Sequence, residues 1–200
     1  MSSNGAQFRD SNTRKTPFEV GSKYPHVRCA RICTAARFQP LGIDGSPEFV
    51  VLNTHLDHRS ELQRKLGASL ILYRAKYEVF HSECPVFVIG DFNRCEKYGY
   101  NHSVRCLVCY SSASSDQGSG AYRILTGDSK PDKVDAEFAF RYFIPDDQLP
   151  DFRMIDIRGA TELLNICGNF STFTDFTQPE NSDYQTGRID FIFGDGLSKW

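Results

Sequence analysis

The sequence predicts an α/β protein of one domain, or part of one such domain, and three observations support this. With 200 residues the chain is long enough to bury one hydrophobic core. Its 40% hydrophobic and 24% charged residues are close to the averages of soluble globular proteins. From residue 49 to residue 89, a strand pattern, a helical pattern and a second strand pattern follow one another, which is the order typical of α/β layers.

The first half of the chain shows the clearest elements. Residues 27–38 and 49–54 have the apolar content of strands, and glycine and proline between them favour a turn, so they predict a hairpin. Residues 60–81 predict a helix, because apolar side chains recur at steps of three and four: Leu62, Leu66, Leu70, Tyr73, Tyr77 and Phe80. Cys84 and Pro85 end the helix, and the apolar run after them predicts a strand at 86–89.

The later elements are predicted from weaker signals. A second helix is expected over about residues 101–112, followed by the loop SSASSDQGSG, which is rich in serine and glycine. Residues 129–150 have the composition of a long acidic loop. β-Branched and aromatic content predicts further strands within 152–160, 170–176 and 188–194. We expect residues 1–16 to be disordered or poorly ordered and residues 17–200 to form the domain.

The bulk composition excludes several classes of protein. The net charge is −2, whereas proteins that bind along duplex nucleic acid are usually basic. Lysine and arginine crowd the first 37 residues, a pattern that we interpret as ordinary solvated surface. The odd number of cysteines, seven, fits neither a disulfide framework nor a zinc site of standard spacing. No signal peptide or membrane-spanning stretch is visible, which predicts a cytoplasmic protein without a membrane anchor.

Polar residues stand at the ends of four predicted strands. These are Asn53 and His55 in NTHLDH, Asp91 and Asn93 in GDFN, Thr172 and Thr174 in STFTDF, and Asp190 in RIDFIF. Strands packed side by side bring their ends together, so carboxylate, amide and imidazole groups are expected to converge. This set suits the cleavage of phosphate esters, which needs a hydrogen-bond donor, an oriented water and a divalent cation.

In their order and in their residues, the motifs N-T-H-L-D-H, G-D-F-N, T-F and R-I-D-F-I-F resemble those of the endonuclease/exonuclease/phosphatase superfamily. Its members are magnesium-dependent phosphoesterases that include pancreatic-type deoxyribonucleases and abasic-site endonucleases. The resemblance implies part of a two-sheet α/β sandwich, the deoxyribonuclease-like fold, with helices on the outer faces. Four short motifs in the right order are far more specific than any one of them.

The resemblance also implies roles for single residues. His55 would donate a hydrogen bond to a non-bridging phosphate oxygen. Asp91 would orient the attacking water or hold a metal ion, and Asn93 would contact the phosphate. Asp190 would hold a catalytic histidine in its working tautomer. The cation would be Mg²⁺ or Mn²⁺, bound by Asp91 and Asn93.

Other residues near these motifs are predicted to bind the substrate, or their role is left open. Asn53, Arg188 and Thr172 are predicted to bind substrate at the rim of the site. For Asp57 and His58, a role at the start of the following helix is as acceptable as a role in the site. The resemblance does not fix the substrate, which could be a nucleic acid, an inositol phosphate, a sphingolipid or a nucleotide adduct, and the net charge disfavours long DNA.

The chain also departs from the family pattern. It has no counterpart of the family's early metal-binding glutamate or of its Ser-Asp-His motif, and its last histidine is His102. We therefore expect a partial domain that binds the metal weakly, if at all, and is weakly active or inactive in ester hydrolysis. The alternative is an inactive relative that at most binds phosphorylated ligands.

Overall fold

A computed structural model describes residues 8–10, 14–17, 31–41, 45–93, 119–145, 147–168, 172 and 188–198. Its strands are β1 (Phe8–Asp10), β2 (Arg14–Pro17), β3 (Ile32–Pro40), β4 (Phe49–His55), β5 (Val86–Asp91), β6 (Met154–Asp156) and β7 (Asp190–Asp195). Its helices are α1 (Glu61–Ser82), α2 (Gly120–Thr126), α3 (Ala136–Arg141), α4 (Ile157–Ala160) and a short 3-10 helix, Leu163–Asn165. The α/β class predicted from sequence is confirmed.

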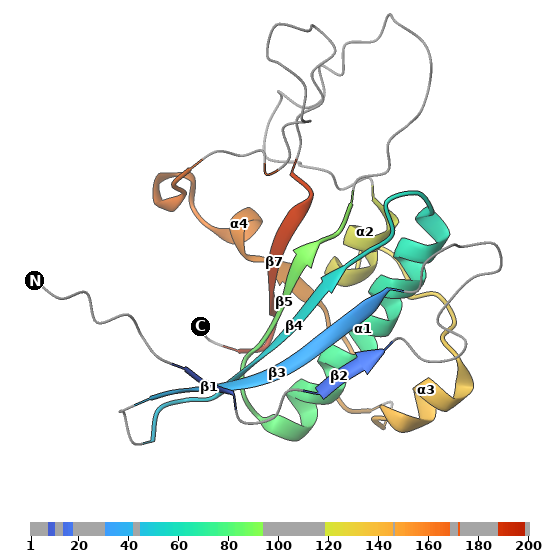
Figure 1. Ribbon diagram of the computed structural model, residues 1–200, viewed down its shortest axis with the longest axis horizontal. Coiled ribbons are helices and arrows are strands. Elements are labelled where there is room, and N and C mark those ends of the chain that lie inside the picture. Colours follow the sequence, from blue (N-terminus) through green and yellow to red (C-terminus); the bar gives the residue numbers. More distant parts are fainter. Residues whose placement is uncertain are drawn as a thin grey trace, which may run out of the picture.

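All the described strands belong to one sheet of seven strands, and the second sheet of the predicted sandwich is not seen among the described residues. The strand order is β1-β3-β4-β5-β7-β6, and β2 also pairs with β3. β3 and β4 form the expected antiparallel hairpin, while β4 and β5 run parallel and are joined by α1. β7 is antiparallel to β5, so the start of β7 lies beside the carboxyl ends of β4 and β5 (Figure 1).

Helix α1 begins and ends at recognisable signals. The hydroxyl of Ser60 accepts a hydrogen bond from the amide of Gln63 at 3.2 Å, which caps the first turn. At the other end Glu83 adopts a left-handed conformation with φ of 53°, and its amide donates to the carbonyl of Val79. Pro85 follows at once. These signals explain why the helix predicted at 60–81 is confirmed almost to its ends.

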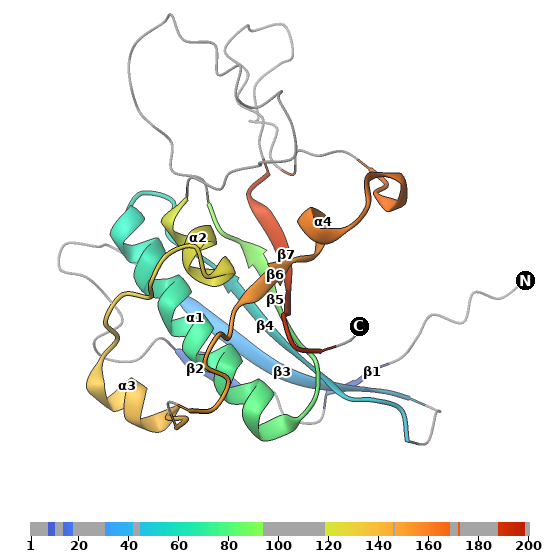
Figure 2. The same cartoon turned by 180° about the vertical axis from the view of Figure 1, so that it is seen from behind.

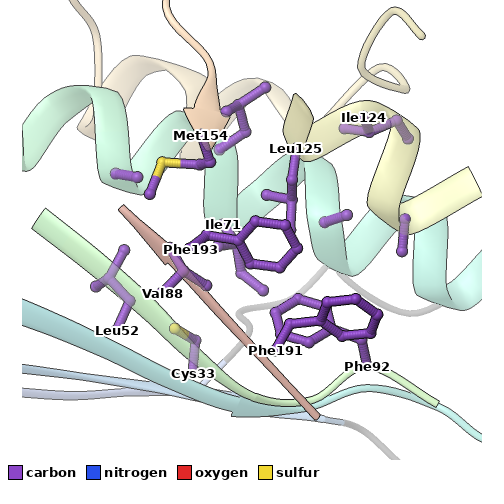
Figure 3. Close-up of a cluster of buried hydrophobic side chains, with 14 of the residues drawn as sticks. Cys33, Leu52, Ile71, Val88, Phe92, Ile124, Leu125, Met154, Phe191 and Phe193 are labelled. Carbon is purple, nitrogen blue, oxygen red and sulfur yellow. The ribbon is translucent and has the colours of Figure 1, made fainter. Parts of the chain in front are cut away.

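Helices α1 and α2 cover one face of the sheet, as the reverse view shows (Figure 2). Between them and the strands lies the main core, in which Leu52, Ile71, Val88, Ile124 and Phe193 are fully buried (Figure 3). The part of α1 that contacts this core is rich in small residues, and Gly67 approaches the Leu56 side chain so closely that a β-carbon there would lie 2.8 Å from it. The helix lies so close to the sheet that only small side chains fit at positions such as Gly67 on the face of α1 that contacts the core.

The opposite face of the sheet is also apolar but is not sealed. Three aromatic rings contact one another across three neighbouring strands: Phe38 stacks on Phe49 with ring centroids 5.4 Å apart, and Phe49 meets Phe87 edge to face at 6.0 Å. Ile32 and Ile192, on the same face, are 56% and 53% exposed. His55, Asp91 and Asp190 lie on this face at the end of the sheet, so the candidate site is continuous with an apolar surface.

Several predicted elements need correction. The predicted acidic loop at 129–150 contains α3, which begins at the N-cap Asp135 and packs Phe138 against α1. The strand predicted within 152–160 ends at Asp156, where α4 begins. Helix α2 was not expected, and its N-cap, Ser119, lies within the predicted loop. All three helices are too short to show a periodic apolar pattern, and α2 and α3 begin at a capping side chain.

Other predictions are only partly tested. The helix expected over about 101–112 and most of the strand expected within 170–176 lie outside the described residues. Strands β1 and β2 lie within or overlap residues 1–16, where disorder was expected, and both pair with β3. The domain boundary near residue 17 stays a prediction. Within the described part of the chain, no helix is long and apolar enough to cross a membrane.

Candidate functional site

The strand register brings three predicted site residues into one row. The Cα atom of His55 is paired with that of Asp91, and the Cα atom of Asp91 with that of Asp190. Cross-strand partners point to the same face of a sheet, so the three side chains share one face at one edge. Residues separated by up to 135 positions in the chain (190 − 55) are thus immediate neighbours.

His55 and Asp91 are in contact, and both reach the surface. The Nε2 atom of His55 lies 3.6 Å from Oδ2 of Asp91, and the two side chains are 59% and 26% exposed. The other oxygen of Asp91 accepts a hydrogen bond of 2.8 Å from the backbone amide of Asn93. The carboxylate is therefore fixed from one side while its second oxygen faces the imidazole.

Asn93 is held in an unusual conformation beside this carboxylate. Its φ of 46° lies in the left-handed region, which asparagine tolerates better than most residues. Its side-chain Nδ2 donates a hydrogen bond of 2.9 Å to the carbonyl of Leu56, which follows His55. This bond uses one N–H of the carboxamide, and the carboxamide oxygen is the atom that can bind a cation or accept a hydrogen bond.

Gly90 was not predicted as part of the site, but it is essential to the way Asp91 is placed. Its φ is +139°, and a β-carbon there would lie 1.9 Å from the carbonyl oxygen of Thr54. Only glycine fits between β4 and β5 at this point. The signal in the sequence was the glycine that interrupts the apolar run before Asp91.

Asn53 and Thr172 were predicted to bind substrate, and the structure places both near the row. Asn53 is exposed two residues before His55 on β4 and therefore lies on the same face. The hydroxyl oxygen of Thr172 accepts hydrogen bonds from the amides of Ile189 and Asp190, at 3.0 and 3.1 Å. Thr172 thus contacts the backbone at the start of β7 and holds Asp190 in place. Thr174 lies outside the described residues.

Arg188 does not lie at the rim, and that prediction is wrong. Its side chain is 5% exposed and makes two hydrogen bonds of 2.7 Å to the carboxylate of Asp156, which is 3% exposed. Its guanidinium also lies over the ring of Phe191, 4.3 Å from the centroid. Both side chains are buried, so Arg188 connects β6 to the start of β7 and its guanidinium is not available to a substrate.

The pKa of Asp91 is raised above its ordinary value of 3.8. Burial is the main cause, and the negative charge of Asp190 adds to it, while the hydrogen bond from Asn93 and the charges of His55 and Arg31 act in the opposite direction. Because the folded pKa exceeds the unfolded one, the contribution of Asp91 to stability is present at low pH and is lost as the pH rises through the folded pKa. At neutral pH its charge destabilises the fold.

Two variants test the pH dependence of the contribution of Asp91 to stability. Asp91→Asn should raise the free energy of unfolding at pH 7, measured in urea, and the gain should shrink as the pH falls below the folded pKa. Asp190→Asn should lower the pKa of Asp91, followed by carboxyl ¹³C NMR, because it removes a like charge. A stability gain that is the same at pH 3 and pH 7, or an unchanged Asp91 pKa in Asp190→Asn, would contradict this account.

No protein-family model matches the sequence, and no curated protein matches it. Solved structures do share its fold. An endonuclease/exonuclease/phosphatase family protein from Bacteroides thetaiotaomicron has a TM-score of 0.52 at 19% identity, covering 94% of this chain and 50% of that protein. A mannosyl-6-phosphatase from the same organism has a TM-score of 0.54 at 19% identity, covering 95% and 54%.

An endonuclease/exonuclease/phosphatase from Bacteroides vulgatus has a TM-score of 0.52 at 21% identity, covering 94% of this chain and 55% of that protein. The chain therefore spans about half the length of these three structures. The likeness extends over nearly all of this chain and agrees with the order of the sequence motifs. The chain has the fold of the endonuclease/exonuclease/phosphatase proteins.

Proposed function

We propose that the protein hydrolyses phosphate esters at the row formed by His55, Asp91 and Asp190. The observation that supports this most is the direct pairing of the three residues across β4, β5 and β7. An imidazole in contact with a carboxylate, both open to solvent, can engage an anionic ester that neither group could orient alone. The fold is shared with a mannosyl-6-phosphatase, which is consistent with this chemistry.

In this proposal the residues have separate tasks. His55 donates a hydrogen bond from Nε2 to a non-bridging oxygen of the phosphate. Asp91 accepts a proton or a hydrogen bond from the attacking water, and its raised pKa suits that exchange. Asp190, whose backbone is fixed by Thr172, adds the second negative charge that a cation needs at this edge.

The side chains present fit a divalent cation such as Mg²⁺ or Mn²⁺ in part. Asp91 and Asn93 offer oxygen atoms, and Mg²⁺ is usually bound by one or two carboxylates together with waters and substrate phosphates. When bound, the cation would stabilise the charge that develops on the phosphate. Within the described ranges, no group of three or more His, Cys, Asp or Glu side chains could hold a metal ion. We therefore expect weak affinity that increases when a phosphate ester is present.

The incomplete ligand set supports a second candidate. A protein that keeps His55 and Asn93 but lacks a third acidic ligand could bind phosphorylated molecules without cleaving them. If this second candidate is right, the protein should bind phosphate in the presence of EDTA and should release no hydrolysis product.

Hydrolysis of p-nitrophenyl phosphate and bis(p-nitrophenyl) phosphate separates the two candidates. With Mg²⁺ or Mn²⁺ the purified protein should release nitrophenol slowly, and EDTA should stop it. His55→Ala and Asp91→Asn should each lower kcat/KM by about a hundredfold, the lower end of the usual loss of an acid–base group. Asp151→Asn, in an exposed turn, is the matched control. Turnover that survives both site variants would exclude this site.

A further inference from the structure

A group of basic side chains beside the site has no task in the proposed hydrolysis. It consists of Arg31, His58 and Arg59, which we call the basic rim. Arg31 directly precedes β3, and His58 and Arg59 lie in the loop between β4 and α1. Because Cys33 is paired with Thr54, the start of β3 lies beside the end of β4. The basic rim therefore lies at the same edge of the sheet at which His55 lies.

Both arginines contact the imidazole ring of His58. The Nη2 atom of Arg31 lies 3.3 Å from Nδ1 of His58, and Nε of Arg59 lies 2.9 Å from Nε2 of the same ring. A neutral imidazole has only one nitrogen that accepts a hydrogen bond, so at most one of these two contacts is a hydrogen bond. The other guanidinium therefore keeps N–H groups that can donate to an anion.

Asp57 does not supply an acceptor for these N–H groups. Its Oδ1 accepts hydrogen bonds of 2.8 Å from the amides of Arg59 and Ser60, and these fix the loop. Its Oδ2 lies 3.6 Å from Nε of Arg31, too far for a hydrogen bond, and within the part of the chain that the structure describes this buried Nε has no hydrogen-bond partner. Among the described residues, Asp57 is the carboxylate that forms an ion pair with Arg31, and Arg59 forms none.

The loop does not need the side chains of His58 and Arg59 for its own stability. The carbonyl of Asp57 accepts a hydrogen bond of 2.7 Å from Arg64, which is 1% exposed, and Ser60 caps α1. His58 and Arg59 are exposed. Their exposure and their contact with Arg31 indicate a surface arranged for an anion rather than a packing interaction.

The basic rim lies at the same end of the sheet as the row formed by His55, Asp91 and Asp190, because Arg31 directly precedes β3, whose Cys33 is paired with Thr54, the neighbour of His55. We propose that Arg31, His58 and Arg59 bind a second phosphate group of the substrate, while His55 and Asp91 act on the first. The substrate is then a small molecule with at least two phosphates. This proposal rests on the proposed function for the identity of the first phosphate, but not for the binding of the second.

A small molecule fits the charge distribution better than a nucleic-acid strand. The whole chain carries a net charge of −2, and the basic rim contains only two arginines. Binding along a strand uses many phosphate contacts and a basic surface. A single additional phosphate needs no more than the two guanidinium groups present.

Binding can be tested without turnover. Titration calorimetry in EDTA compares inorganic pyrophosphate, inorganic phosphate and a short single-stranded oligonucleotide. Pyrophosphate should bind about tenfold more tightly than phosphate, as expected for an additional charge-assisted hydrogen bond. Arg59→Gln should remove that difference, Arg59→Lys should restore part of it, and Arg141→Gln, an exposed arginine on α3, should leave it intact.

The same variants connect the rim to hydrolysis. Arg59→Gln should lower the ratio of kcat/KM for a bisphosphorylated ester to that for a monophosphorylated ester about tenfold, chiefly through KM. Equal binding of pyrophosphate and phosphate, no binding of either, or identical results for Arg59→Gln and Arg141→Gln would overturn the proposal. Tighter binding of the oligonucleotide through Arg59 would overturn the assignment to a small molecule. If pyrophosphate binds through Arg59 but no ester is cleaved, the second-phosphate site stands and the proposed hydrolysis fails.

Discussion

Gly90→Ala is expected to lower the free energy of unfolding by about 4 kcal/mol, the sum of backbone strain and steric overlap. The added β-carbon would lie 1.9 Å from the carbonyl oxygen of Thr54 and 2.9 Å from its carbonyl carbon. Both atoms belong to backbone, and β4 is paired with a strand on each side, so neither can move away cheaply. The change would also displace Asp91, the next residue.

Urea unfolding and hydrolysis measured on the same samples test this expectation. For a chain of this size the loss corresponds to a melting temperature lower by roughly 10 °C. Gly45→Ala is the matched control, because Gly45 has a φ of +74° but nothing within 4 Å of the added β-carbon. That control should cost about 1 kcal/mol, from backbone strain alone. Equal losses for the two variants would show that overlap with Thr54 is unimportant.

Arg188→Met should cost about 4 kcal/mol, because it leaves the buried carboxylate of Asp156 without its partner. The two hydrogen bonds of 2.7 Å disappear, and the hydroxyl of Tyr122, 3.4 Å from Asp156, cannot replace them. The pair connects β6 to the residues just before β7. Loss of the pair should therefore also disturb Asp190.

Two further variants make the Arg188 experiment specific. Arg141→Met removes an arginine from an exposed pair with Glu137 and should cost no more than about 0.5 kcal/mol. The double variant Asp156→Leu with Arg188→Met should recover most of the loss, because a buried ion pair replaced by apolar side chains is often tolerated. A single Arg188→Met variant as stable as Arg141→Met would show that the pair contributes little.

The local sequence determined the elements that carry the site. Apolar runs bordered by polar residues predicted β4, β5 and β7, and helical spacing together with Ser60 and Pro85 predicted α1. The order of the motifs predicted the fold that the solved structures share. These features depend on neighbours in the chain, so the sequence contains the information directly.

Tertiary contacts decided what the sequence left open or predicted wrongly. The predicted apolar stripe of α1 included Leu62 and Tyr73, which are 57% and 38% exposed, while the main core contains Ala68, Ile71, Leu72 and Ala75 instead. Arg188 was assigned to the rim because its position beside Asp190 is visible in the sequence, whereas its partner Asp156 lies 32 residues away and becomes a partner only when β6 pairs with β7. The register that aligns His55, Asp91 and Asp190, and the approach of Arg31 to His58, likewise depend on strand pairing over long distances in the chain, which no local pattern specifies.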